Sequence, residues 1–176
     1  DILRTELRPT ALTISDALRA KASEIVNSSD FPTRKNEAWK YTNVNGLNKL
    51  VFDGKNAPIS EPLIISNRSR KLFVKNGQVS EDQSVLSGIK TSWDVLPEFY
   101  TDDAFDALNV LYCTAAIQLN FDNAENETIE LVFENTTNSA IFPRLFIQCN
   151  KGAKGTVILN FQGAEKNASF INVSTY

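Results

Sequence analysis

The stretch CTAAIQLNF at residues 113–121, followed by ETIELVF at residues 127–133, decides how the second half of this chain folds. Every second side chain of the first stretch is apolar, which is the period of a β-strand with one buried face. These apolar positions are Ala115, Ile117, Leu119 and Phe121. Further apolar runs follow at residues 145–149, 157–161 and 170–173. The sequence therefore predicts successive strands from here to the last residue.

The spacing of these strands fits two architectures. Their centres recur roughly every 12–14 residues, with polar turn segments such as DNAENE (122–127) and NKGAKG (150–155) between them. An antiparallel β-sandwich joins neighbouring strands by hairpins, whereas a solenoid stacks its strands in parallel rungs. Periodicity alone leaves both open. No polar element closes the last strand, so we expect the natural protein to continue beyond Tyr176.

The first half of the chain shows helical and turn signals instead. Apolar side chains at helical spacing predict a helix over residues 13–26, ended by Ser28 and the following Pro32. A second, shorter helical stretch is predicted for residues 35–41. Two prolines and a glycine predict a loop over residues 53–62.

A hairpin and one more helix complete this half. Asn76-Gly77 lies between two apolar runs and suits the positive φ angles of a type I′ turn. Residues 101–103 (Thr-Asp-Asp) can cap a helix. That helix is predicted to carry on one side Phe105, Leu108, Leu111 and Tyr112. The fold class is therefore α+β, with a helical region and hairpin over residues 1–112 and a strand region over residues 113–176.

Composition removes several function classes. The 176 residues carry 18 basic and 21 acidic side chains, and this net charge of −3 offers no field for a nucleic-acid backbone. No apolar run is long enough to span a membrane, and the first ten residues, DILRTELRPT, lack the apolar stretch of a secretory signal. The chain has no histidine and two cysteines, so the usual proton-transfer group and a tetrahedral zinc site are both missing. We expect no catalytic, cofactor-binding or metal-binding residues and no enzymatic activity.

Several motifs have simple structural interpretations. Cys113 and Cys149 are expected to pack as small apolar residues, since neither has a histidine partner. Residues 152–156 (GAKGT) lack the spacing of a phosphate loop and predict a plain turn. Residues 122–127 lack the register of a calcium loop and predict a solvated turn. Six Asn-x-Ser/Thr triplets fit chance in an Asn-rich chain better than glycosylation, and they begin at Asn27, Asn67, Asn126, Asn135, Asn167 and Asn172.

The segment at residues 31–42 places aromatic residues among charges. One interpretation is a partner-docking surface, because Trp, Tyr and Arg are favoured anchors in interfaces. The other is that Trp39 and Tyr41 close a small core while the neighbouring lysine and arginine side chains stay in water. The physical chemistry of these residues favours the second.

The same segment resembles a protein family. FPTRKNEAWKYTNVNGL (31–47), with Glu37-x-Trp39-Lys40-Tyr41-Thr42 at its core, resembles the N-terminal signature of SufD and, more loosely, SufB, which belong to the SUF iron–sulfur cluster assembly system. LFVKNGQVS (72–80) resembles the short hairpin of that family. FDALNVLYCTAAIQLNF (105–121), ETIELVF and FPRLFIQCNKGAKGTVI (142–158) resemble its passage into the core, with Asn109 and the pair Pro143-Arg144 in matching places.

The resemblance implies a fold and a role. The strands from residue 113 would be the first rungs of a right-handed parallel β-helix, and the chain would be an N-terminal fragment of a SufD-like protein. Its role would be that of a non-catalytic cytoplasmic scaffold, paired with a SufB-like protein and a SufC-like ABC-type ATPase. An iron–sulfur cluster, and a flavin, would belong to the assembled complex and not to this fragment. No functional residue of the family matches a position here.

Two further expectations remain. The alternative function is a secreted all-β sandwich binding module, which would show antiparallel hairpins after residue 113. If the strands instead begin a β-helix, its cut end exposes apolar side chains. We then expect a second copy of the chain to cover that end, giving a homodimer.

Overall fold

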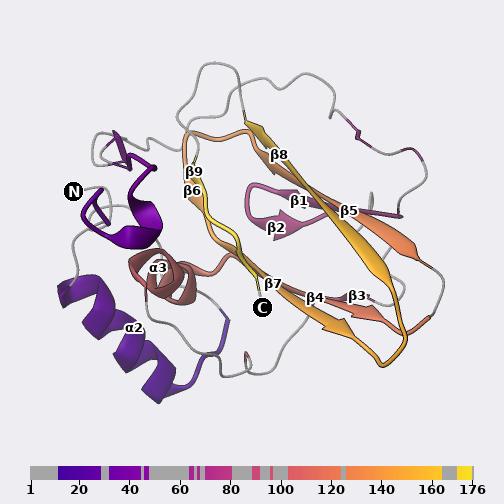
Figure 1. The fold of residues 1–176 in the computed structure, drawn as a ribbon, viewed down its shortest axis with the longest axis horizontal. Coiled ribbons are helices and arrows are strands. Elements are labelled where there is room, and N and C mark those ends of the chain that lie inside the picture. Colours follow the sequence, from indigo (N-terminus) through magenta and orange to yellow (C-terminus); the bar gives the residue numbers. More distant parts are fainter. Residues whose placement is uncertain are drawn as a thin grey trace.

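A computed structural model describes the residues in the ranges 12–28, 32–44, 46–47, 64–65, 67, 70–80, 89–91, 96, 103–123, 126–163 and 170–175 (Figure 1). The helices are α2 (Asp16–Ser28), the short 3₁₀ helix η1 (Glu37–Trp39) and α3 (Ala104–Tyr112). The strands are β1 (Arg70–Lys75), β2 (Gln78–Val79), β3 (Ile89–Lys90), β4 (Ala115–Phe121), β5 (Glu127–Asn135), β6 (Ala140–Ile141), β7 (Pro143–Cys149), β8 (Gly155–Gly163), β9 (Phe170–Ile171) and β10 (Ser174–Thr175). None of the helices in these ranges is long and apolar enough to cross a membrane.

The strands form three sheets. Sheet order is β2-β1-β5-β8 in the first, β10-β7-β4-β3 in the second and β6-β9 in the third. All pairs among β4–β10 are parallel, and only β1–β2 and β3–β4 are antiparallel. The sandwich expectation, with hairpins after residue 113, is therefore wrong for the strands that the structure describes. Strand periodicity fixes which side chains are buried, but it does not fix the strand direction.

The chain visits the sheets in a repeating order. From β4 onward, successive strands enter the second, first and third sheets, and the cycle then begins again. Ala115 pairs with Pro143, and Glu127 pairs with Gly155, so both registers are offset by 28 residues (143 − 115 and 155 − 127). The α+β class is confirmed. Within the described residues the sheets make no closed or solenoid β-helix, so the finer expectation remains a proposal.

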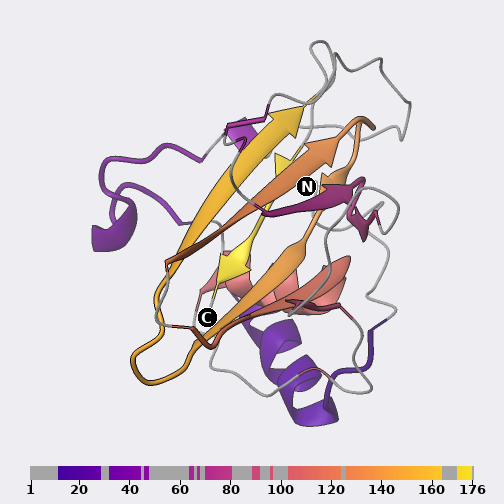
Figure 2. The ribbon, with the colours of Figure 1, turned by 90° about the vertical axis from the view of Figure 1, so that its right-hand side faces the viewer.

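The first and second sheets face each other across the main core (Figure 2). The alternating apolar positions predicted for residues 115–121 all point into this core. Opposite them lie the inward side chains of β1 and β5, namely Leu72, Val74, Ile129, Leu131 and Phe133. Each of these five is fully buried at 0% exposure, so strand alternation was a correct guide to the core.

The hairpin forms as predicted. Asn76 and Gly77 have φ angles of 49° and 82°, which are the left-handed values that a type I′ turn requires. A Cβ atom on Gly77 would lie 2.7 Å from Thr114 Cβ, so the position also lacks room for a side chain. Strand β1, which leads into this turn, also pairs in parallel with β5. The hairpin thus shares a sheet with the second half of the chain, and the proposed division at residue 112 remains a prediction.

The helices pack on the outer face of the second sheet. A helix was predicted over residues 13–26, and α2 begins three residues later and ends at Ser28. It buries Leu18 and Ala22 against α3. Ala116 of β4 and Cys113 belong to the same cluster, which joins the helices to the sheet. This smaller core holds α3 in place above β7, where the candidate site lies.

Two helix predictions need correction. Residues 35–41 contain only the three-residue 3₁₀ helix η1, because the segment lacks an apolar face that a longer helix could bury. Helix α3 exists and is capped by Asp103, but of the four side chains expected on its packed side only Leu108 is fully buried. The buried face of α3 runs instead through Ala107, Leu108, Asn109 and Val110. Helix α3 contacts both the second sheet and α2. Its buried face therefore combines small apolar side chains with the amide of Asn109.

Candidate functional site

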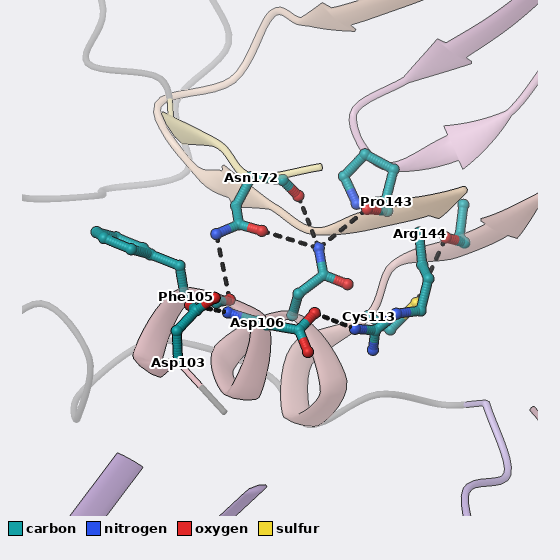
Figure 3. A network of polar contacts seen from close by, with 9 residues as sticks. Asp103, Phe105, Asp106, Cys113, Pro143, Arg144 and Asn172 are labelled. Atoms are coloured by element: carbon teal, nitrogen blue, oxygen red, sulfur yellow. Dashed lines mark hydrogen bonds and ion pairs between the residues drawn. The ribbon is translucent and has the colours of Figure 1, made fainter. Parts of the chain in front are cut away.

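The N-terminus of α3 begins a polar network against the second sheet (Figure 3). Asp103 is the N-cap residue, and its carboxylate accepts a 2.9 Å hydrogen bond from the backbone N–H of Asp106. This satisfies one of the free donors of the first turn. The cap turns the next carboxylate, that of Asp106, towards β7.

Asp106 forms an ion pair with Arg144. Arg144 lies on β7 and is fully buried at 0% exposure, and its Nη2 is 2.5 Å from Asp106 Oδ1. The carboxylate is also largely buried, with 13% of its side chain exposed. Since a buried guanidinium is costly without an opposite charge, Asp106 is what permits arginine at this position.

Asn109 ties α3 to two separate strand segments. Its Nδ2 lies 2.9 Å from the carbonyl oxygen of Pro143, 2.8 Å from that of Asn172 and 3.0 Å from Asn172 Oδ1. Asn172 in turn donates to the carbonyl of Phe105 at 3.3 Å. One buried amide therefore fixes the helix relative to β7 and to the segment between β9 and β10.

A groove of about 570 Å³ opens beside this network. Its walls include Trp39, Phe105, Phe170, Asn172 and Ser174. The Trp39 ring is tilted against the Phe105 ring, with centroids 5.0 Å apart. The signature tryptophan thus lies at the N-terminal end of α3 and lines the same groove as residues of β9 and β10.

The two aromatic residues Trp39 and Tyr41 of the segment at residues 31–42 differ in burial. Trp39 is half-buried against Phe105, as expected for a residue that closes a small core. Tyr41 is 92% exposed, so the expectation that it shares this core is wrong. The Lys40 ammonium lies 5.6 Å from the Tyr41 ring centroid, which is a surface contact. The docking interpretation of this segment stays open.

The two cysteines differ. Cys113 is buried, and burial raises the pKa of its thiol to about 11 although the nearby Arg144 acts in the opposite direction. It packs as a small apolar residue, as predicted. Cys149 is exposed, which contradicts the prediction for that thiol. Cys149 lies in β7 and pairs in register with the buried Phe121 of β4. On the other side of β7 the described residues place no strand beside Cys149, because β10 pairs only with Arg144 and Leu145.

The remaining motifs behave as plain structure. Residues 150–154 turn between β7 and β8, with Gly152 at φ 82°. Asp122 accepts a 2.6 Å hydrogen bond from Asn150, and residues 124–125 of that predicted turn lie outside the described ranges. Asn135 is fully buried and Asn172 is held in the network, so neither is presented for glycosylation. Asn167 and the predicted loop at 53–62 lie outside the described residues.

The structure brings together three residues that the resemblance singled out. Asn109 contacts Pro143, and Arg144 follows directly in the same strand. The sequence reasoning missed Asp106 and Asn172, whose positions are fixed by contacts across 38 and 63 residues. The acidic spacing Asp103-x-x-Asp106 was the only local signal for the first. Among the described residues, no group of three or more His, Cys, Asp or Glu side chains is placed to hold a metal ion.

Comparisons with known proteins do not add a family. Scanned against protein-family models and against curated proteins, the chain matches none of them.

Proposed function

We propose that this chain is the N-terminal part of a SufD-like, non-catalytic scaffold subunit of a SUF-type iron–sulfur cluster assembly complex. The observation that carries the proposal is the repeating order of parallel strands from β4 to β10. In this proposal the strands are the first turns of a right-handed parallel β-helix. Parallel connections of this kind are right-handed in nearly all proteins.

The polar network supports the same proposal. In this proposal α3 belongs to the helical region that precedes the β-helix. It is held on the outer face of the second sheet by Asn109 on Pro143 and by Asp106 on Arg144. Asn109, Pro143 and Arg144 are also among the residues in which the chain resembles the family, and Asn109 contacts Pro143 directly.

The proposed role is to hold other proteins and not to perform chemistry. The partners would be a SufB-like scaffold and a SufC-like ATPase, in the cytoplasm, and the iron–sulfur cluster would be the cargo of the complex. A secreted sandwich module is disfavoured, because the described strands after residue 113 pair in parallel and not as hairpins.

The test is reconstitution with the natural gene product. That protein is mixed at micromolar concentration with a SufB-like protein and a SufC-like ATPase from the same source, and the mixture is analysed by size-exclusion chromatography with light scattering. We expect one complex containing all three chains, and no complex with an unrelated ABC-type ATPase. Separate elution of the chain from both partners at these concentrations would overturn the proposal.

A further inference from the structure

The turn segment at residues 32–44 presents a tyrosine and three basic side chains to solvent. Tyr41 is 92% exposed, more than any other large hydrophobic side chain among the described residues. Arg34, Lys35 and Lys40 are exposed as well, and the Lys40 ammonium lies 5.6 Å from the Tyr41 ring centroid. Tyrosine and arginine are favoured anchors in protein interfaces, so this composition is typical of a surface that binds another protein.

The segment is basic although the chain as a whole is acidic. Residues 32–44 contain three basic side chains and one acidic side chain, Glu37, which gives a local charge of +2 (3 − 1). The other residues of the chain carry 15 basic (18 − 3) and 20 acidic (21 − 1) side chains, a charge of −5. The segment therefore attracts an acidic partner that the rest of the chain repels, and this difference directs the partner to one place.

Hydrogen bonds hold the backbone of this segment in successive turns. The N–H of Asn36 donates to the carbonyl oxygen of Thr33 at 2.9 Å, and the N–H of Trp39 donates to that of Asn36 at 2.9 Å. The N–H of Thr42 donates in turn to the carbonyl oxygen of Trp39 at 2.9 Å. Trp39 also packs on Phe105 of α3. The exposed side chains therefore project from an ordered backbone, which reduces the entropy lost on binding.

A groove of about 490 Å³ lies between the two ends of the segment. Its walls are Pro32, Thr33, Arg34 and Lys35 from one end and Thr42, Asn43 and Val44 from the other. Figure 2 shows the segment, in purple at the left, projecting from the sheets and from α2. Guanidinium, ammonium and hydroxyl groups all donate hydrogen bonds, so the side chains of this groove suit carboxylates.

We propose that residues 32–44 are a docking surface for an acidic segment of a partner protein. Tyr41 packs against apolar side chains of that segment, and the three basic side chains pair with its carboxylates. A nucleic acid fits less well, because a phosphate backbone is commonly held by about six or more basic contacts and the rest of this chain repels it. An anionic membrane fits less well too, since lipid-binding clusters contain about four to eight basic residues. The proposal depends on these charges and not on the SUF assignment.

The first test measures the binding of an acidic peptide. The probe is a short fluorescein-labelled peptide of alternating glutamate and leucine, followed by fluorescence anisotropy at low ionic strength. We expect saturable binding in the micromolar range, and a peptide with glutamine in place of glutamate is expected to bind at least about tenfold more weakly. Absence of saturable binding would refute the proposal. Tighter binding of a single-stranded oligonucleotide or of phosphatidylserine vesicles would refute it as well.

A pair of charge reversals shows whether the binding is local. Arg34→Glu combined with Lys35→Glu is expected to weaken binding of the glutamate peptide at least about tenfold. Lys151→Glu combined with Lys154→Glu is the matched control, because both lysines are exposed and the change in net charge is the same. These two lysines lie in the turn between β7 and β8, so the control is expected to change the affinity less than about twofold. Equal weakening in the two double variants would mean that only net charge matters, which contradicts a docking surface.

The second test locates the contact. A carbodiimide joins a carboxylate of the bound peptide to a lysine amine as an amide, and mass spectrometry of the digested product identifies the lysine. We expect coupling at Lys35 or Lys40, and coupling mainly at Lys151 or Lys154 would place the peptide elsewhere and refute the proposal. Tyr41→Ala is expected to weaken binding about fivefold, whereas Tyr41→Phe keeps the ring and the affinity. An unchanged affinity in folded Tyr41→Ala, checked by circular dichroism, would contradict the role of this side chain as the anchor.

Discussion

The ion pair between Asp106 and Arg144 gives the sharpest expectation for a single side chain. Asp106→Ala leaves the fully buried guanidinium without its carboxylate and is expected to destabilise the fold by about 3–5 kcal/mol. Asp103→Ala, one turn earlier, removes only the N-cap and is expected to cost about 1 kcal/mol. Urea unfolding of both variants measures the difference. Equal losses would show that the buried pair contributes no more than the cap.

The buried thiol of Cys113 predicts a dependence on alkaline pH. Its pKa is raised to about 11 by burial, whereas the unfolded chain has the ordinary value of 9.0. Between these values the unfolded state loses the proton and the folded state keeps it, so the free energy of unfolding falls as pH rises. The loss approaches about 3 kcal/mol above pH 11.

Cys113→Ala removes this titration and serves as the comparison. Denaturant unfolding of the chain and the variant at pH 8 and pH 10.5 gives the measurement. We expect the stability difference between them to shift towards the variant at the higher pH. A difference that stays constant across this range would contradict the raised pKa.

At this scale the sequence was informative where the cause is local. The N-cap and the inert Cys113 could be predicted, because capping and apolar packing of thiols depend on neighbours in the chain. The exposure of Tyr41 and the burial of Arg144 could not, because each depends on an element far away in sequence. From the sequence alone Arg144 is expected at the surface, and its burial is explained only by the ion pair with Asp106.

Among the elements, the β1–β2 hairpin offers a matched pair of glycines. Gly77 and Gly152 both have φ of 82°, but an added Cβ would lie 2.7 Å from Thr114 Cβ at Gly77 and would meet nothing within 4 Å at Gly152. Gly152→Ala is therefore expected to cost only the left-handed backbone penalty of about 1–2 kcal/mol. Gly77→Ala should cost at least about 1 kcal/mol more, because overpacking adds to that penalty. Thermal unfolding of the two variants tests this order, and a smaller loss at Gly77 would contradict it.

Element type was easier to predict than element extent. Strands β4, β5, β7 and β8 follow from alternation, and the hairpin follows from Asn-Gly. Of the helix predicted at residues 35–41, the structure contains only the three-residue η1. A short helix is stabilised by tertiary packing more than by local propensity, and this segment has no apolar face to pack. The packed side of α3 was misassigned because the helix contacts two partners at once.

At the scale of the whole molecule, residues that pair in register in neighbouring strands differ in how deeply they are buried. Phe133→Ala in the covered strand is expected to cost about 3–5 kcal/mol, as for other fully buried phenylalanines. Phe161→Ala, one strand further and 52% exposed, is expected to cost less than half as much. Urea unfolding at low micromolar concentration compares them, and equal losses would contradict the open end of the core.

The parallel pairing of the strands could not be predicted from the sequence pattern. A spacing of 12–14 residues between strand centres suits hairpins and stacked turns equally. What separates them is pairing between residues 28 apart, such as Ala115 with Pro143, and no local signal reports that. The groove beside Trp39 could not be foreseen for the same reason, since its walls come from η1, α3 and the last strands.

The parallel ladders are offset by 28 residues for β4–β7 and β5–β8 and by 30 for β6–β9 and β7–β10 (170 − 140 and 174 − 144). These even offsets have a consequence for how such a chain can change over evolutionary time. An insertion in a turn leaves the ladders as they are, whereas one extra residue inside a strand turns every following side chain from the core to the surface. Duplication or loss of a whole unit of 28 or 30 residues returns each side chain to the same face. The architecture therefore accepts changes of length at the turns or in complete units, and it selects against those in between.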